Sequence, residues 1–234
     1  MNIFRLPLKI KVNSFLKLIN QLGYVNANLY LFNRFFNLMP FCLNINKYYF
    51  ASQPLSKQPI LSKNKWPNYN IVELSSVKDF EFNYFPRPVA VFEDRIQQGA
   101  ICLACYKNDE FTGFLWYIKK KFREDEVRCL YNLPFQSVWD FDVYVEPKYR
   151  LSPVFLKLWD EVSFRLTQDG CFHSLSRISA FNAISLQSHK RMGAIIIGWA
   201  VFIKIGVCQL TVSNLKPILH LSFSEKTYPI FNFN

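Results

Sequence analysis

The stretch VWDFDVYVEPKYRLSPVFLKLWDEV, residues 138–162, is followed at 176–193 by SRISAFNAISLQSHKRMG. The first segment has β-branched and aromatic residues up to Val145, then Pro147, and then apolar residues at helical spacing. The two segments together predict a strand, a sharp turn, a long helix, a second strand and a short helix. Polar residues gather at the joints between these elements, so this is the part of the chain in which the sequence points to chemistry.

The rest of the chain extends this alternation of strands and helices. We expect strands at 69–74, 100–106, 111–119, 136–146, 171–178, 194–204 and 207–213, helices at 89–98, 153–168 and 183–192, and a charged loop at 119–128. This order predicts an α+β fold, with a mixed, mostly antiparallel central sheet flanked by helices. We expect residues 69–213 to form this domain, residues 1–68 to form a helical extension with a linker, and residues 214–234 to form a C-terminal tail.

The N-terminal part has an unusual composition. The net charge of the chain is +11, and residues 1–72 contain nine Lys or Arg and no Asp or Glu. Two amphipathic helices are predicted in this part, at 13–22 and around 29–39, before a linker rich in Pro, Ser and Lys. A basic, aromatic and amphipathic segment favours contact with an anionic membrane surface over nucleic acid. The alternative is that these helices pack on the domain or on a second subunit, as in a homodimer.

The cysteines and the start of the chain indicate the compartment. The six cysteines have no framework spacing, no secretory signal is recognisable, and no apolar run approaches the ~18 residues of a membrane span. We therefore expect a cytoplasmic protein with free thiols, with a peripheral position at the inner face of the membrane as a variant. Cys102 and Cys105 lie in a predicted strand and would point to opposite faces, so we expect no metal site there.

Two segments in this order resemble the GNAT acetyltransferase superfamily. DVYVEPKYR, residues 142–150, resembles its Val-x-Pro-x-x-Arg strand and turn, and FNAISLQSHKRMGA, residues 181–194, resembles its Asn-x-x-Ser helix that ends at Gly. The span that encloses the two motifs, residues 142–194, covers about a quarter of the chain, and the wider order of elements covers about 69–213. The resemblance implies an acyl-coenzyme A-dependent N-acyltransferase, most simply an acetyltransferase, that acts on an amine acceptor the sequence does not identify.

The resemblance also implies a set of coenzyme contacts. The pantetheine arm would bind the backbone at Val143 and Val145, and the pyrophosphate would bind at the start of the following helix, where free N–H groups and the helix dipole favour an anion. The candidate residues of this turn are Arg150, Leu151, Ser152, Val154 and Phe155, and those of the second motif are Asn182 and Ser185. Asn182 and Ser185 are equally suited to cap and begin the last helix.

The turn departs from the family pattern at two positions. Pro153 and Phe155 stand where the family usually has glycine and a second small residue, and neither lets the backbone approach a phosphate as closely. Arg150 with Lys148 would compensate from the side. Three outcomes follow: coenzyme A binding with altered contacts, use of the pantetheine arm of an acyl carrier protein, or a degenerate site.

The catalytic candidates are Asp140, Asp142 and His189. His189 stands where many members of the family have a tyrosine acid, and we expect it to protonate the leaving thiolate. Asp140 and Asp142 are expected on one strand face, as general base or as anchor for the acceptor ammonium. The alternatives are a surface histidine and two solvated carboxylates, and Arg177 is expected at the acceptor site or in a structural ion pair. The competing hypothesis for the whole protein is a catalytically degenerate GNAT-like binding module.

Overall fold

The computed structural model describes residues 12–38, 43–61, 66–79 and 87–233. Its main feature is a nine-stranded sheet in the order β11-β10-β9-β1-β8-β7-β4-β3-β2, beside a three-stranded sheet in the order β12-β6-β5. The strands are β1 Leu43–Pro54, β2 Tyr69–Leu74, β3 Ile101–Lys107, β4 Glu110–Lys119, β5 Lys121–Arg123, β6 Leu130–Asn132, β7 Ser137–Val145, β8 His173–Ser179, β9 Ile195–Ile205, β10 Cys208–Ser213, β11 Leu219–Ser222 and β12 Ile230–Asn232. The helices are α1 Val12–Leu22, α2 Tyr24–Phe36, α3 Val89–Gln97, α4 Val154–Gln168 and α5 Ala183–Arg191.

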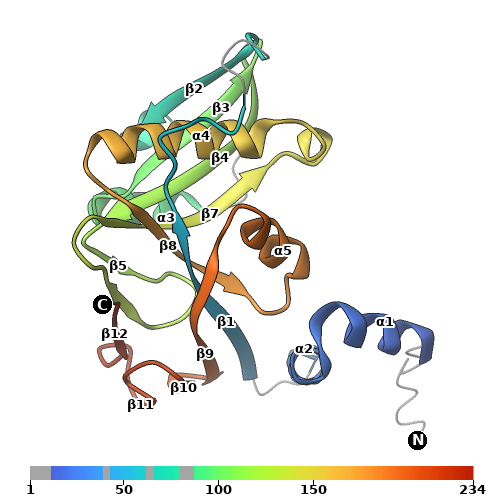
Figure 1. Cartoon of the computed structure of the whole chain (residues 1–234). Coiled ribbons are helices and arrows are strands. Elements are labelled where there is room, and N and C mark those ends of the chain that lie inside the picture. The colour runs from blue at the N-terminus through green and yellow to red at the C-terminus, as the bar shows by residue number, and fades with distance from the viewer. Residues whose placement is uncertain (1–11, 39–42, 62–65, 80–86, 234) are drawn as a thin grey trace, which may run out of the picture.

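The predicted fold class is confirmed. In the large sheet β7 and β8 form the one parallel pair described, and the remaining pairs are antiparallel. Helices α4 and α5 lie in front of the sheet in the view of Figure 1. The apolar stripe of α4, which includes Val154, Leu158 and Val162, is buried against this face. Phe92 of α3 joins the buried cluster of the opposite face, which the small sheet also covers.

The predicted boundary near residue 68 is wrong for residues 43–54. These residues form β1, which pairs antiparallel with β8 on one side and with β9 on the other. Tyr48 and Phe50 of β1 are buried in the aromatic core, so β1 is a central strand of the sheet rather than a linker. The polar and proline-rich residues that suggested a linker begin at the end of β1, and the partners of β1 lie more than a hundred residues away, beyond the reach of a local pattern.

The expected C-terminal tail is also part of the fold. Residues 219–222 extend the large sheet as β11, and residues 230–232 pair parallel with β6 as β12. Phe231 and Phe233 are buried, with ring centroids 5.3 Å from that of Phe50 in both cases. The end of the described chain therefore packs against β1 in one aromatic core.

The cysteines of β3 behave as predicted. Cys102 joins the aromatic cluster on one face of the sheet and Cys105 joins the cluster under α4 on the other. Both thiols are buried and free, and burial raises the pKa of each. Neither is suited to redox or metal chemistry in this position.

The burial of β1 predicts the outcome of a substitution. Phe50→Ala removes a fully buried ring that contacts four other aromatic residues, and we expect it to lower the free energy of unfolding by about 3–5 kcal/mol. Phe32→Ala, on the exposed side of α2, serves as the matched control and should cost under about 1 kcal/mol. Urea unfolding of the whole chain measures both values, and equal losses would show that β1 is not part of the cooperative core.

Candidate functional site

Strands β7 and β8 separate halfway along their length. They pair in parallel only from Ser137 to Asp140 of β7, which face His173 to Ser176 of β8. Beyond this point β7 stays paired with β4 through Val145, and β8 stays paired with β1 through Ser179. Figure 1 shows the two strands diverging. Residues 141–145 of β7 thus have no strand partner on the β8 side within the described chain, and Val143 and Val145 lie along this opening.

A β-bulge in β7 separates the two candidate carboxylates. The register with β4 shifts between Phe114 and Trp116, and Asp142 has a φ of 48°, which L-residues rarely adopt. The bulge turns the Asp142 carboxylate toward the face that carries α3. Its Oδ2 accepts hydrogen bonds from Arg87 Nε at 2.8 Å and from Arg95 Nη1 at 2.6 Å. The expectation that Asp140 and Asp142 share a strand face is therefore wrong, because an unbroken strand was assumed.

Asp140 lies at the closed end of the opening, on the face that carries α4. Trp139 packs in the aromatic cluster and Val138 under α4, so alternation along the strand places Asp140 on the side of Val138. Asp140 is 2% exposed, and its Oδ1 accepts a hydrogen bond from Ser174 Oγ at 2.5 Å. Burial raises its pKa to about 7, and the bond from Ser174 only partly offsets this rise. A carboxyl group with this pKa can accept and release a proton near neutral pH.

His189 is buried between α4 and α5. Its Nδ1 lies 3.2 Å from Gln53 Oε1 of β1, and its ring stands edge-on to those of Phe155 and Trp159 at centroid distances of 6.3 and 6.0 Å. Burial lowers its pKa to about 4, so the imidazole is neutral at pH 7. A neutral imidazole carries no extra proton to donate, and this position conflicts with the predicted acid role.

Gln53, Ser174 and Ser176 are buried polar residues on the α4 side that the motif comparison missed. Ser174 bonds Asp140, and Gln53 contacts His189. For the two serines the sequence does contain a signal. They alternate with Leu175 in β8, and both faces of that strand are covered. For Gln53 no local signal exists, since its place depends on the insertion of β1.

Helix α4 begins one residue later than the predicted 153. Pro153 is its N-cap and makes no side-chain cap bond. The hydroxyl of Ser152 donates to the Tyr149 carbonyl at 2.5 Å and accepts a long bond of 3.4 Å from Val154 N. The N–H groups of Phe155 and Leu156 have no backbone acceptor within the described chain, so this helix start retains unpaired donors.

The side chains of this turn differ in their burial and in their partners. Val154 is buried and packs near Gly113 of β4, where an added Cβ would lie 2.4 Å from the Tyr144 carbonyl oxygen. Leu151 is fully exposed. Lys148 is exposed and forms an ion pair with Glu110, with which a phosphate contact would compete. Arg150 is exposed and makes no ion pair with any described residue, which leaves it available to an anion.

Two further predicted residues have structural partners. Asn182 is the N-cap of α5, and its Oδ1 accepts from Ser185 N at 3.0 Å. Arg177 forms ion pairs with Glu124 at 2.5 Å and Glu126 at 2.9 Å, on the face opposite α4. The capping alternative and the ion-pair alternative are therefore the ones observed, and a coenzyme contact of Asn182 or Ser185 stays a prediction.

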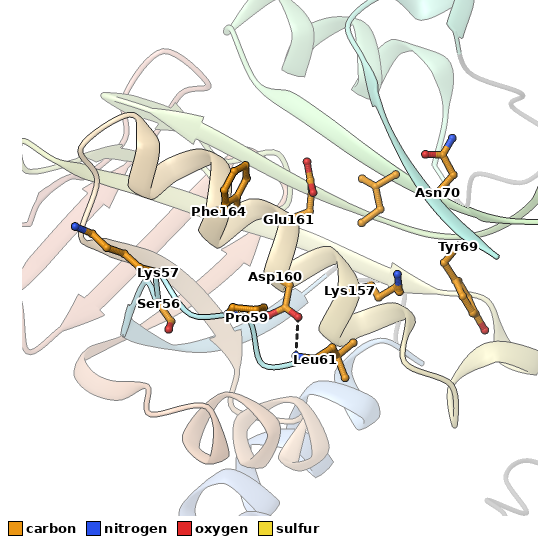
Figure 2. Close-up of a pocket in the computed structure, with 11 residues that line it drawn as sticks. Ser56, Lys57, Pro59, Leu61, Tyr69, Asn70, Lys157, Asp160, Glu161 and Phe164 are labelled. Atoms are coloured by element: carbon orange, nitrogen blue, oxygen red, sulfur yellow. Dashed lines mark hydrogen bonds between the residues drawn. The ribbon is translucent and has the colours of Figure 1, made fainter. Parts of the chain in front are cut away.

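A groove of about 520 Å³ follows the other side of α4, away from the opening. Figure 2 shows it between α4, the segment 56–61 and the first residues of β2. Asp160 of α4 accepts hydrogen bonds from the N–H groups of Ile60 and Leu61 at 2.7 and 2.9 Å, which fixes this segment along the helix. The groove contains none of the predicted site residues.

The described residues contain no group of three or more His, Cys, Asp or Glu side chains placed to hold a metal ion. No helix among them has the length and hydropathy needed to cross a membrane.

Comparison with known proteins gives structural likenesses only. No family model and no curated protein sequence matches the chain. A conserved protein of unknown function from Staphylococcus epidermidis is similar in fold, with a TM-score of 0.51, 13% identity, and coverage of 82% of this chain and 80% of the other.

Weaker likenesses include proteins described as acetyltransferases. A GCN5-related N-acetyltransferase from Sphaerobacter thermophilus has a TM-score of 0.45 and 11% identity over 74% of this chain and 55% of the other, so the chain spans about half the length of that protein. AAC(6')-Iy, solved with the bisubstrate analogue CoA-S-monomethyl-acetylneamine, has a TM-score of 0.39 and 19% identity over 53% of this chain and 89% of the other.

The raised pKa of Asp140 predicts how stability depends on pH. A carboxyl group whose pKa is raised by folding stabilises the fold below its unfolded value of about 3.8, and this contribution is lost as pH rises through about 7. Asp140→Asn removes the cost of the buried charge, so the difference between its melting temperature and that of wild type should grow in favour of the variant between about pH 4 and pH 7. At the upper end of this range the variant should exceed wild type in free energy of unfolding by about a few kcal/mol. The exposed Asp109→Asn variant should show no such trend, and a trend shared by both variants would contradict the placement of Asp140.

Proposed function

We propose that the protein is an acyl-coenzyme A-dependent N-acyltransferase of the GNAT type, most simply an acetyltransferase, that acts on a primary amine. One observation carries the proposal. The opening between β7 and β8 has a buried carboxyl group of neutral pKa, Asp140, at its closed end and leads at its open end to the start of α4. The two motifs that resemble the GNAT superfamily supply the strand, turn and helices around this opening.

The opening offers part of the contacts that an acyl-coenzyme A donor needs. Extended backbone at Val143 and Val145 offers hydrogen bonds to the amides of a pantetheine arm, because β8 no longer occupies that edge. The N–H groups of Phe155 and Leu156 and the guanidinium of Arg150 suit a pyrophosphate. Pro153 removes one donor from this set, so we expect weaker phosphate binding than a glycine-rich turn provides.

The reaction that suits this site is direct transfer. The amine nitrogen attacks the thioester carbonyl, the new C–N bond forms, and the C–S bond breaks to release the coenzyme A thiolate. Asp140 takes the proton from the acceptor ammonium, directly or through one water, because its pKa lies near the working pH. Asp142 is bound to two arginines, and His189 is neutral and buried. Our proposal therefore assigns the proton transfer to neither of them.

A catalytically degenerate binding module is the second candidate. It is favoured by Pro153 in the turn and by the position of His189, which leaves the thiolate without the predicted acid. Use of an acyl carrier protein in place of free coenzyme A is compatible with the same opening, because that donor also delivers a pantetheine arm.

Calorimetry and an activity assay separate the two candidates. We expect wild type to bind acetyl-coenzyme A and to release free thiol from it in the presence of a panel of primary amines. Asp140→Asn should bind the donor as wild type does and lose activity by roughly 10²–10⁴-fold, the usual contribution of a general base. His189→Gln should retain most of the activity. Donor binding without turnover in wild type would support the degenerate module, and absence of donor binding would contradict both.

A further inference from the structure

The outer face of the C-terminal strands is apolar, half-buried on β9 and β10 and exposed on β11. Cross-strand pairs place Ile203 beside Leu210 and Leu210 beside Leu221, and they place Val201 beside Val212 and Val212 beside Leu219. Leu219 and Leu221 are 67% and 51% exposed. We call these six side chains of β9, β10 and β11 the C-terminal apolar face. Ile205, Val207, Ile218 and Phe223, at the neighbouring turns and strand ends, are also exposed.

The inner face of β10 and β11 is polar, whereas that of β9 carries Ala200 and Phe202 of the aromatic core. Gln209, Thr211, Ser213 and Ser222 are at most 2% exposed, and Gln209 bonds both backbone groups of Arg128. This arrangement is the reverse of the usual one, in which apolar side chains of an outer sheet point to the core and polar ones to water. A contiguous apolar surface of this kind indicates a binding face.

Helix α2 lies on the same side of the sheet. The amide of Asn26 donates to the Tyr49 hydroxyl at 3.0 Å, and Asn33 Oδ1 accepts from Ile45 N at 2.7 Å. Ile45 stands opposite Ile203 in the register of β1 and β9, so α2 borders the C-terminal apolar face. Phe32 of α2 and Leu38, which follows the helix, are 55% and 78% exposed and add exposed apolar side chains to this part of the chain.

The net positive charge of the protein is concentrated towards the two ends of the sequence. Residues 66–191 carry sixteen Lys or Arg and sixteen Asp or Glu, and are therefore neutral. Residues 1–65 carry nine basic and no acidic residues, and residues 192–234 carry three basic residues and one acidic residue, Glu225. Five of the nine basic residues of 1–65 lie outside the described residues, and Lys57 lines the groove along α4. Among the described residues, those of α1, α2 and β1 carry Lys17, Arg34 and Lys47 and no acidic residue, and β1 pairs with β9, so this part of the fold is basic.

We propose that the C-terminal apolar face, together with the exposed side of α2, docks on an anionic lipid surface. Apolar side chains enter the interface of the bilayer while lysines such as Lys204 and Lys216 meet acidic headgroups. Charge decides against a second copy of the chain as the occupant. An isologous dimer would bring two copies of Lys204 and Lys216 together, with Glu225 as the one acidic residue of 192–234, whereas an anionic membrane complements these lysines.

Vesicle flotation of the full chain tests the proposal. Wild type should float with phosphatidylglycerol-containing vesicles and much less with phosphatidylcholine vesicles, and added salt should weaken binding. Leu219→Glu/Leu221→Glu should lower binding roughly tenfold or more, because it puts charge on the apolar face. Phe135→Glu/Phe164→Glu is the matched control, since it makes the same change at two exposed aromatic residues elsewhere, and its binding should fall by no more than about twofold.

A second variant leaves β11 unchanged, so its result does not depend on whether the two glutamates disturb the folding of that strand. Lys204→Gln/Lys216→Gln leaves the strands unchanged and should weaken binding to the anionic vesicles alone. The proposal is overturned if wild type floats with neither vesicle, or if the control variant loses as much binding as the Leu219 and Leu221 variant. It is also overturned if sedimentation shows a dimer of wild type that Leu219→Glu/Leu221→Glu dissociates while vesicle binding is absent.

Discussion

The antiparallel pairing of β1 with β8 on one side and β9 on the other is the constraint on which the rest of the structure depends. It holds β8 away from β7 beyond Ser176, so the opening that carries the candidate site exists because β8 follows β1. It also brings Gln53 to His189 and Phe50 to the aromatic core. A segment from the basic N-terminal part therefore helps to form both the site and the core.

A single bulge gives the two carboxylates of β7 different chemistry. Asp142 forms ion pairs with the guanidinium groups of Arg87 and Arg95. Asp140 is two residues away, on the other face, with a serine hydroxyl as its side-chain partner, and burial raises its pKa to about 7. The local backbone thus separates a structural ion pair from a group suited to proton transfer.

Local patterns predicted most of the fold and less of the site. The strand at 69–74, the hairpin of β3 and β4, and the succession from β7 to β10 follow from alternation, helical spacing and turn residues. The place of β1, the role of β12 and the burial of His189 depend on partners far along the chain, which single-sequence patterns do not contain. The bulge at Asp142 was missed because no glycine marks it, although aspartate is among the residues that tolerate this conformation.

Hydrogen–deuterium exchange of the full chain, with and without coenzyme A, tests the central claim most directly. If the opening between β7 and β8 binds the donor, exchange should slow at the backbone of residues 141–145 and at the first turn of α4, with little change in the groove along 56–61. Slower exchange confined to that groove, or none at all, would contradict the account.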